Sequence, residues 1–348
     1  MRLFVTSIIV LLGMTSLQAQ LGGESTYQFL NLISSPRQAA LGGKVLTNVD
    51  YDVTQALYNP ATINLDMDNQ LSFNYSNYLG DIRYGTAAYA YTIDRRTQTF
   101  HLGMTYINYG SFDGYDENGS NTGTFTGNAA ALSVGYATQI GYSDFHVGAN
   151  LKLITSKLEQ YSSFGIATDI GIIYIDPNLE FNAALVIRNF GTQLTTYAGM
   201  KESLPFEIDL GFSQTLENVP IRWHLTFENL QKWPIASPNP ARATTDLDGT
   251  QTEEDINFVS NLFRHTILGV ELFPNKGFNI RLGYSFRRAA GLYTNIALVP
   301  TTETPVKVTT VHSGVQGGCD PINEAYFGSW NSNSAPINFN GQTAVLTA

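Results

Sequence analysis

The sequence predicts an all-β fold, an antiparallel transmembrane β-barrel of about 14 strands with an N-terminal plug or hatch segment. Apolar and polar residues alternate with a period of two along most of the chain from Leu71 to Phe286. Charged residues make up only 14% of the chain and aromatic residues 12%, and no apolar run after the first 20 residues is long enough for a membrane-spanning helix. This combination is typical of a barrel whose strands turn alternate residues toward lipid.

Residues 1–20 predict a secretory signal peptide. Arg2 supplies the positive start, an apolar run follows, and Ala19 is the small residue needed for cleavage. The run is short for a membrane span, and an N-terminal membrane anchor is the alternative interpretation. The only cysteine, Cys319, lies far away, so the sequence predicts neither a lipidated N-terminus nor a disulfide framework.

Residues 21–68 predict turns and short helical stretches rather than a strand. Leu41-Gly42-Gly43 is a flexible break, and Asp52 is placed to cap a short helix that Asn59-Pro60 would end. Pro36 also fits poorly in a closed strand ladder. We therefore expect this segment to pack in, or against, the mouth of the barrel.

Residues 69–348 predict the barrel itself. We expect about eleven strands up to Phe286, joined by short turn signals such as Asp176-Pro177-Asn178, and hence an antiparallel meander. A soluble β-sandwich with one solvated face would show the same alternation. A meander of this length, however, would expose two edges unless it closed into a barrel.

The polar face of the strands carries charged side chains that lipid would exclude and a wet lumen would accept. They are Arg83, Lys152, Glu180, Arg188, Glu207, Arg222, Glu228 and Arg281. His101, His146 and His224 lie on the same face without metal-ligand spacing, and we interpret them as lumen lining. No catalytic elbow or phosphate loop is present, so the sequence predicts no catalytic, cofactor-binding or metal site. The net charge of -10 disfavours a nucleic-acid partner.

Two longer connections interrupt the strand series. Residues 112–128 are rich in Gly, Asn, Asp and Thr and predict an exposed loop. Residues 232–264 contain an acidic patch followed by apolar residues at near-helical spacing, which predict a short amphipathic helix. That helix either covers a barrel rim or docks a partner. Its apolar residues are Ile256, Val259, Leu262 and Phe263.

The alternation weakens after Ala289, so the strands expected in the tail are less regular. Single-chain outer-membrane barrels usually end on a strand with a terminal aromatic residue, whereas this sequence ends at Ala348. Either the last strands are divergent, or the tail is not the native terminus of such a barrel.

Three runs in the N-terminal segment carry a family resemblance: YQFLNL, AALGG and ALYNPA. In this order behind a signal peptide they resemble the PorQ family of the Bacteroidetes type IX secretion system, over residues 21–288. The Asn-Pro-Ala element is similar to that of fatty-acid-transporter-like barrels, which include PorV. The residues that carry the resemblance are Tyr27, Phe29, Leu30, Leu41, Gly42, Gly43, Asn59, Pro60 and Ala61.

The resemblance implies a non-enzymatic outer-membrane subunit that helps hold the cell-surface complex attaching secreted cargo. It implies no cofactor, and as partners it implies outer-membrane lipid and surface proteins resembling PorZ, PorU and PorV. The wider superfamily also implies a transporter of hydrophobic molecules, with lipid in the lumen and Gly42-Gly43 as the hinge of a movable hatch. A general porin is a third possibility, which the plug-like N-terminus disfavours.

Overall fold

The computed structural model describes residues 25–78, 81–94, 98–115, 120–235, 258–274 and 278–289, together with short strands at 244–245, 251–252, 295–300, 311–312, 335–339 and 342–346. The predicted signal peptide and Ile256 lie outside the described residues.

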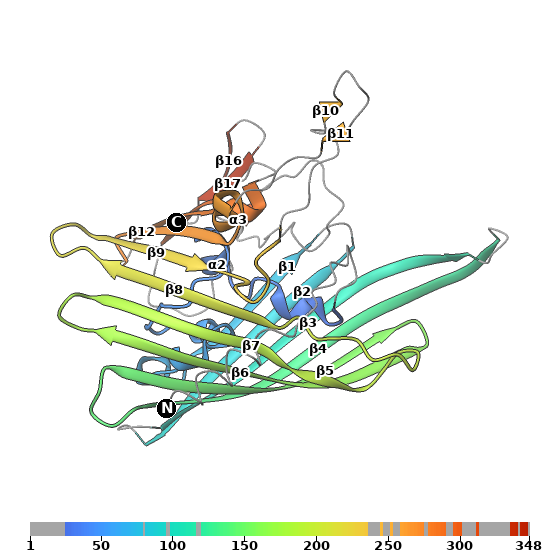
Figure 1. The fold of residues 1–348 in the computed structure, drawn as a ribbon, viewed down its shortest axis with the longest axis horizontal. Coiled ribbons are helices and arrows are strands. Elements are labelled where there is room, and N and C mark those ends of the chain that lie inside the picture. The colour runs from blue at the N-terminus through green and yellow to red at the C-terminus, as the bar shows by residue number, and fades with distance from the viewer. Residues whose placement is uncertain are drawn as a thin grey trace.

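The main sheet is an antiparallel meander (Figure 1). Its long strands are β1 (Leu71–Asn77), β2 (Arg83–Asp94), β3 (Gln98–Tyr115), β4 (Asn121–Gln139), β5 (Phe145–Leu158), β6 (Tyr161–Asp176), β7 (Phe181–Thr195), β8 (Glu207–Thr215), β9 (Ile221–Phe227), β12 (Thr266–Leu272) and β13 (Phe278–Ser285). Each pairs with its neighbour in this order. The predicted all-β class, the antiparallel meander and the eleven strands up to Phe286 are thus confirmed.

Short elements complete the chain. The short strands are β10 (Thr244–Thr245), β11 (Gln251–Thr252), β14 (Asn295–Pro300), β15 (Val311–His312), β16 (Ala335–Phe339) and β17 (Gln342–Leu346). The helices outside the N-terminal segment are α3 (Phe258–Arg264) and α4 (Phe286–Ala289). No helix in the described part of the chain is both long enough and apolar enough to cross a membrane.

The two faces of the sheet differ in polarity. Along β3, Phe100, Leu102 and Met104 are exposed on the outer face, whereas His101 between them is buried on the inner face. The inner face also buries most of the charged residues assigned to it from the sequence: Lys152, Arg188, Glu207, Glu228 and Arg281. Two assignments were wrong, because Arg83 is exposed at the first residue of β2 and Glu180 is exposed in the turn before β7.

The exposed loop predicted over residues 112–128 is instead the end of a long hairpin. β3 continues to Tyr115 and β4 begins at Asn121, and the two strands extend well beyond their neighbours (Figure 1). The Phe112 and Phe125 rings are paired across the strands with centroids 5.4 Å apart. This cross-strand pair and the continued ladder outweigh the Gly- and Asn-rich composition that predicted a loop.

The connections differ in length at the two ends of the sheet. The two longest connections, β7–β8 and β9–β12 with α3, lie at one end because antiparallel strands alternate in direction. The tip of the protruding β3–β4 hairpin and the short β1–β2 and β5–β6 turns lie at the same end. The turns after β4, β6, β8 and β12 are short and lie at the opposite end. Long loops on one side and short turns on the other are typical of outer-membrane barrels.

The inner face of the sheet is covered by residues 25–70, which we call the inner segment. In Figure 1 it is the blue chain enclosed by the curved sheet. Its backbone forms short helices and turns rather than a strand, and Ala39, Leu41, Ala56 and Asn59 are completely buried. The helices are η1 (Gln28–Asn31), α2 (Pro36–Ala40), η2 (Val53–Leu57), η3 (Pro60–Thr62) and η4 (Leu65–Met67).

Candidate functional site

The most elaborate polar arrangement in the described residues is the interface between the inner segment and the inner face of the sheet. An irregular segment leaves backbone carbonyls without helical or strand partners, and burying them unpaired would be costly. The sheet supplies the missing donors through inward side chains. Thr86 donates to the carbonyl of Ser34 (2.6 Å), Asn150 to Ala56 (2.8 Å) and Asn182 to Thr47 (3.0 Å).

The YQFLNL run lies on β6 and β7. Tyr27 adopts a left-handed backbone conformation (φ 56°), and its hydroxyl lies 2.5 Å from the Ser163 hydroxyl on β6. Phe29 and Leu30 are buried, and the Leu30 carbonyl accepts a hydrogen bond from Arg188 on β7 (3.2 Å). The first run therefore attaches the start of the inner segment to the sheet.

The AALGG run forms a helix end packed on β13. Ser35 caps α2 by accepting a hydrogen bond from the Gln38 amide, and the Gly43 amide closes the helix by donating to the Gln38 carbonyl (2.9 Å). Gly42 has a φ of +90°. A Cβ atom on Gly283 of β13 would lie 1.9 Å from the Gly42 nitrogen, so the two backbones touch directly.

The ALYNPA run is a buried, capped turn. Asp52 caps η2 by accepting from the Thr54 amide, which is the cap expected from the sequence. Asn59 accepts from the Ala61 amide (3.0 Å) and donates to the Leu46 carbonyl (2.7 Å), which links two parts of the inner segment. A Cβ on Gly148 would lie 2.4 Å from the Pro60 backbone. The turn therefore fits the sheet only because β5 has no side chain there.

The same close approach recurs along the sheet. At each of these inward glycines an added Cβ would meet an atom of the inner segment at 3.3 Å or less, and the strands involved run from β3 to β13. The glycines are Gly103, Gly135, Gly148, Gly165, Gly171, Gly211, Gly269 and Gly283. Sequence reasoning placed some of them on the polar face but gave them no role. The available signal was glycine recurring at inward positions of otherwise regular strands.

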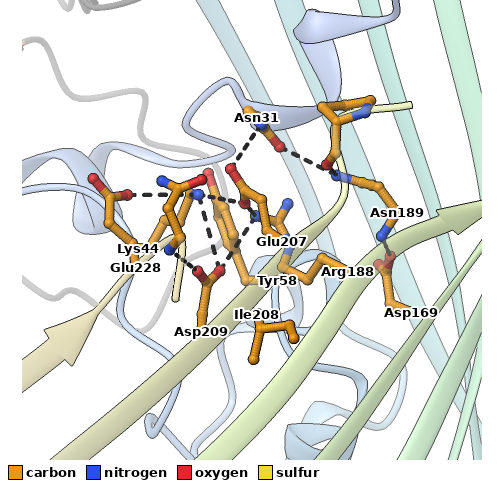
Figure 2. Close-up of polar contacts among 12 residues, drawn as sticks. Asn31, Lys44, Tyr58, Asp169, Arg188, Asn189, Glu207, Ile208, Asp209 and Glu228 are labelled. Atoms are coloured by element: carbon orange, nitrogen blue, oxygen red, sulfur yellow. Dashed lines mark hydrogen bonds and ion pairs between the residues drawn. The ribbon is translucent and has the colours of Figure 1, made fainter. Parts of the chain in front are cut away.

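Lys44 is the centre of the first of two buried charge clusters (Figure 2). Its ammonium lies 2.5 Å from a Glu207 oxygen, 3.5 Å from Glu228 and 3.9 Å from Asp209. Arg188 contacts the same Glu207 oxygen at 2.9 Å. The guanidinium of Arg188 also lies over the ring of Tyr58, 4.9 Å from its centroid. One cation from the inner segment thus meets three carboxylates from the sheet and its rim.

The network extends through the amides of Asn31 and Asn189 to Asp169 (Figure 2). The side-chain amide nitrogen of Asn31 donates to Glu207 (2.8 Å). The side-chain oxygen of Asn31 accepts a hydrogen bond from the side-chain amide of Asn189 (3.2 Å). The Asn189 backbone donates to Asp169 (2.8 Å), which forms an ion pair with Lys152 at 2.6 Å. These contacts connect the inner segment to β5, β6, β7 and β8.

Arg37 and Glu271 form the second cluster, on α2 and β12. Two guanidinium nitrogens of Arg37 contact the two Glu271 oxygens at 3.0 and 3.2 Å, a bidentate geometry. Arg37 also contacts Asp50 of the inner segment at 2.7 Å. Arg281 contacts Glu271 at 2.7 Å, and His224 lies 3.4 Å from it.

The two buried cations of the inner segment, Lys44 and Arg37, are held in their charged forms. Burial would lower the pKa of Lys44, but the attraction of Glu207, Asp209 and Glu228 outweighs it and raises the pKa above its ordinary value. Burial likewise opposes the charge of Arg37, whose pKa is nevertheless raised well above its ordinary range by Asp50, Glu271 and Asp52. Both cations therefore contribute to holding the inner segment at neutral pH.

The polar groups of this interface hold the inner segment against the sheet. For example, Nε2 of His101 on β3 lies 3.1 Å from the Val53 carbonyl oxygen of the inner segment. Within the described residues no group of three His, Cys, Asp or Glu side chains is arranged to hold a metal. The lumen expected to be wet is instead filled at this level, because the side chains lining it pack on the inner segment.

The predicted partner-contact residues are not part of this interface. Val259, Leu262 and Phe263 lie on α3, in the connection between β9 and β12. The predicted amphipathic helix is therefore present, beginning at Phe258.

Comparisons with known proteins give two partial likenesses. A family model described as "Choice-of-anchor L domain" matches residues 258–348, about a quarter of the chain. The crystal structure of the Ralstonia pickettii toluene transporter TbuX is similar with a TM-score of 0.41 and 13% identity, over 76% of this chain and 88% of that chain. No curated protein sequence matches.

Proposed function

We propose that the chain is an outer-membrane β-barrel whose lumen is closed by the inner segment. The polarity of the sheet supports the membrane assignment, because a water-soluble sheet would bury its large apolar side chains rather than its charges. The exposed outer-face residues come from strands around the whole sheet: Phe73, Leu102, Val134, Leu151, Ile170, Leu185, Leu268 and Leu282. The unequal lengths of the connections at its two ends support the same assignment.

Within this class, we propose a non-enzymatic subunit of the type IX secretion system that anchors the complex attaching cargo at the cell surface. The observation that carries the proposal is the position of the three family-like runs. All three lie in the inner segment and make the contacts that hold it in the sheet. A barrel closed and stiffened in this way suits a rigid membrane base for surface proteins resembling PorZ, PorU and PorV.

A transporter of hydrophobic molecules would need a passage or a ligand cavity beside the inner segment. One cavity there, lined by Leu30, Leu57, Lys152 and Arg188 among others, has a volume of about 20 Å³. That is room for a single water molecule rather than a hydrocarbon. For a hydrocarbon to pass at this point, the inner segment would have to move away from the strands that line the cavity.

The test is deletion of the gene followed by measurement of cargo at the cell surface. We expect cargo that is exported but poorly attached, or not exported, and we expect the full chain to restore attachment. Replacing residues 246–263 with a short Gly-Ser turn should reproduce part of the defect while the barrel still folds. Normal cargo display together with lost uptake of a hydrophobic compound would reject the secretion role and favour transport.

A further inference from the structure

Helix α3 has the reverse of the polarity that a surface helix normally shows. A helix on a soluble protein buries its apolar side chains and exposes its polar ones. Here Phe258, Val259 and Phe263 are 64%, 55% and 49% exposed, whereas Asn261 is only 7% exposed. The helix thus turns its polar side toward the protein and its apolar side outward, which is the same inversion seen in the strands.

The outward side of α3 is continuous with the outer face of the sheet. Leu268 on β12 and Tyr284 on β13 are directly paired and exposed on that face. The Tyr284 ring contacts Phe286 with centroids 4.8 Å apart, and Phe286 contacts Phe263 at 5.1 Å. Aromatic rings therefore extend the apolar outer face past the end of β13 onto the helix.

A second aromatic stack fixes the start of the helix. Trp233 lies between Phe258 and the buried His265, with ring centroids at 4.8 and 5.0 Å. Both nitrogens of the His265 ring lie within hydrogen-bond distance of carbonyl oxygens, those of Glu228 (2.6 Å) and Trp233 (3.0 Å). The helix is thus held in one orientation, and its exposed apolar side is not a consequence of loose attachment.

We infer that α3 is an interfacial helix whose exposed apolar side lies in the lipid at the membrane boundary. The inference rests on the proposed membrane barrel and adds a lipid contact that the strands alone do not provide. Aromatic side chains are favoured at this depth. Arg264, half-exposed at the end of the helix, is placed where a cation meets lipid phosphate groups. The helix thereby fixes how deeply this end of the barrel sits.

The experiment places a single tryptophan on the helix and measures its quenching by brominated lipids. The full chain is reconstituted in lipid vesicles after Trp223, Trp233 and Trp330 are changed to Phe, and Phe263→Trp is added. We expect blue-shifted emission and a loss of fluorescence that is greater with bromines near the headgroup than near the chain ends. Phe258→Trp serves as a second probe in case Phe263→Trp prevents folding.

Two matched variants distinguish the possible failures. Leu282→Trp on the outer face should lose more fluorescence to chain-end bromines, and Tyr115→Trp on the protruding hairpin should lose none. Quenching at Leu282→Trp without quenching on α3 would overturn the inference and leave the barrel intact, as expected if a protein covers the helix. Absence of quenching at Leu282→Trp as well would instead reject the membrane barrel.

Discussion

Lys44 illustrates how a single side chain secures an irregular segment. Its ammonium is buried among Glu207, Asp209 and Glu228, so it stays charged only because they surround it. Replacing a buried pair by apolar groups can be nearly neutral, but removing one partner leaves the others uncompensated. The carboxylates therefore make this position intolerant of a neutral residue.

We expect Lys44→Met to destabilise the folded protein by about 3–5 kcal/mol, because the buried carboxylates lose the cation at their centre and Arg188 alone does not replace its contacts. The measurement is urea unfolding followed by the gel shift between folded and unfolded barrel. Lys201→Met removes the same charge from an exposed position and should change little. Equal stability of the two variants would show that Lys44 does not hold the segment.

Raising the pH should loosen the inner segment. The folded pKa of Lys44 lies above its ordinary 10.5, so its contribution to stability is complete below about pH 10.5 and is lost as the pH rises through the folded value. Burial also raises the pKa of Tyr58, which acts in the same direction. Protease cleavage within residues 25–70 should therefore increase above about pH 10.5.

The variant Lys44→Arg separates the contribution of Lys44 to this pH dependence from that of Tyr58. Arginine keeps its charge in this range, so the variant should resist cleavage to a higher pH than the unmodified protein. An unchanged cleavage profile would assign the effect to Tyr58 or to general unfolding rather than to Lys44.

The strands contact the inner segment through their inward side chains and also at inward glycines, where the missing side chain lets the two backbones approach closely. Gly283 and Gly42 bring two backbones into contact, and Gly148 accommodates the Asn-Pro-Ala turn. A side chain at such a position would force the segment away from the strand. The inward glycines of β3 to β13 are therefore part of the binding surface.

Gly283→Ala should be more harmful than Gly211→Ala. The new Cβ would lie 1.9 Å from backbone at Gly283, but 3.0 Å from the Leu46 side chain at Gly211, where a small shift relieves it. Overpacking of this kind costs about 1–3 kcal/mol or more, and we expect the smaller cost at Gly211. Urea unfolding of both variants tests this, and similar stabilities would mean that the segment moves freely on the sheet.

The outer face offers a second test of the strands. Leu282→Lys should destabilise by about 2–4 kcal/mol if Leu282 lies near the middle of the bilayer. Leu179→Lys, in an exposed turn, is the control and should be nearly neutral. Ser285 is not a suitable control, because it is buried on the inner face. Equal effects at Leu282 and Leu179 would place the sheet outside lipid.

The alternation of apolar and polar residues alone predicts most of the strands. The strands from Leu71 to Phe286 follow the alternation, because each strand separates an apolar environment from a packed polar one. The hairpin end over residues 112–128 was missed because cross-strand pairing, rather than composition, forms it. The Lys44 and Arg37 clusters were also missed, since their partners on the sheet lie more than 150 positions away in the sequence and only the fold brings them together.

Because the inner segment fills the lumen, ions should not pass freely through the barrel. In a planar bilayer the protein should show no steady ionic current, because the inner segment occupies the space that is open in a porin. Loosening the segment with Arg37→Met and Lys44→Met together removes its two principal cationic attachments. That variant should show brief openings, since the segment leaves its position without being lost from the chain. Steady, porin-like current through the unmodified protein would contradict the closed barrel, and silence of the double variant would mean that the glycine contacts alone keep the segment in place.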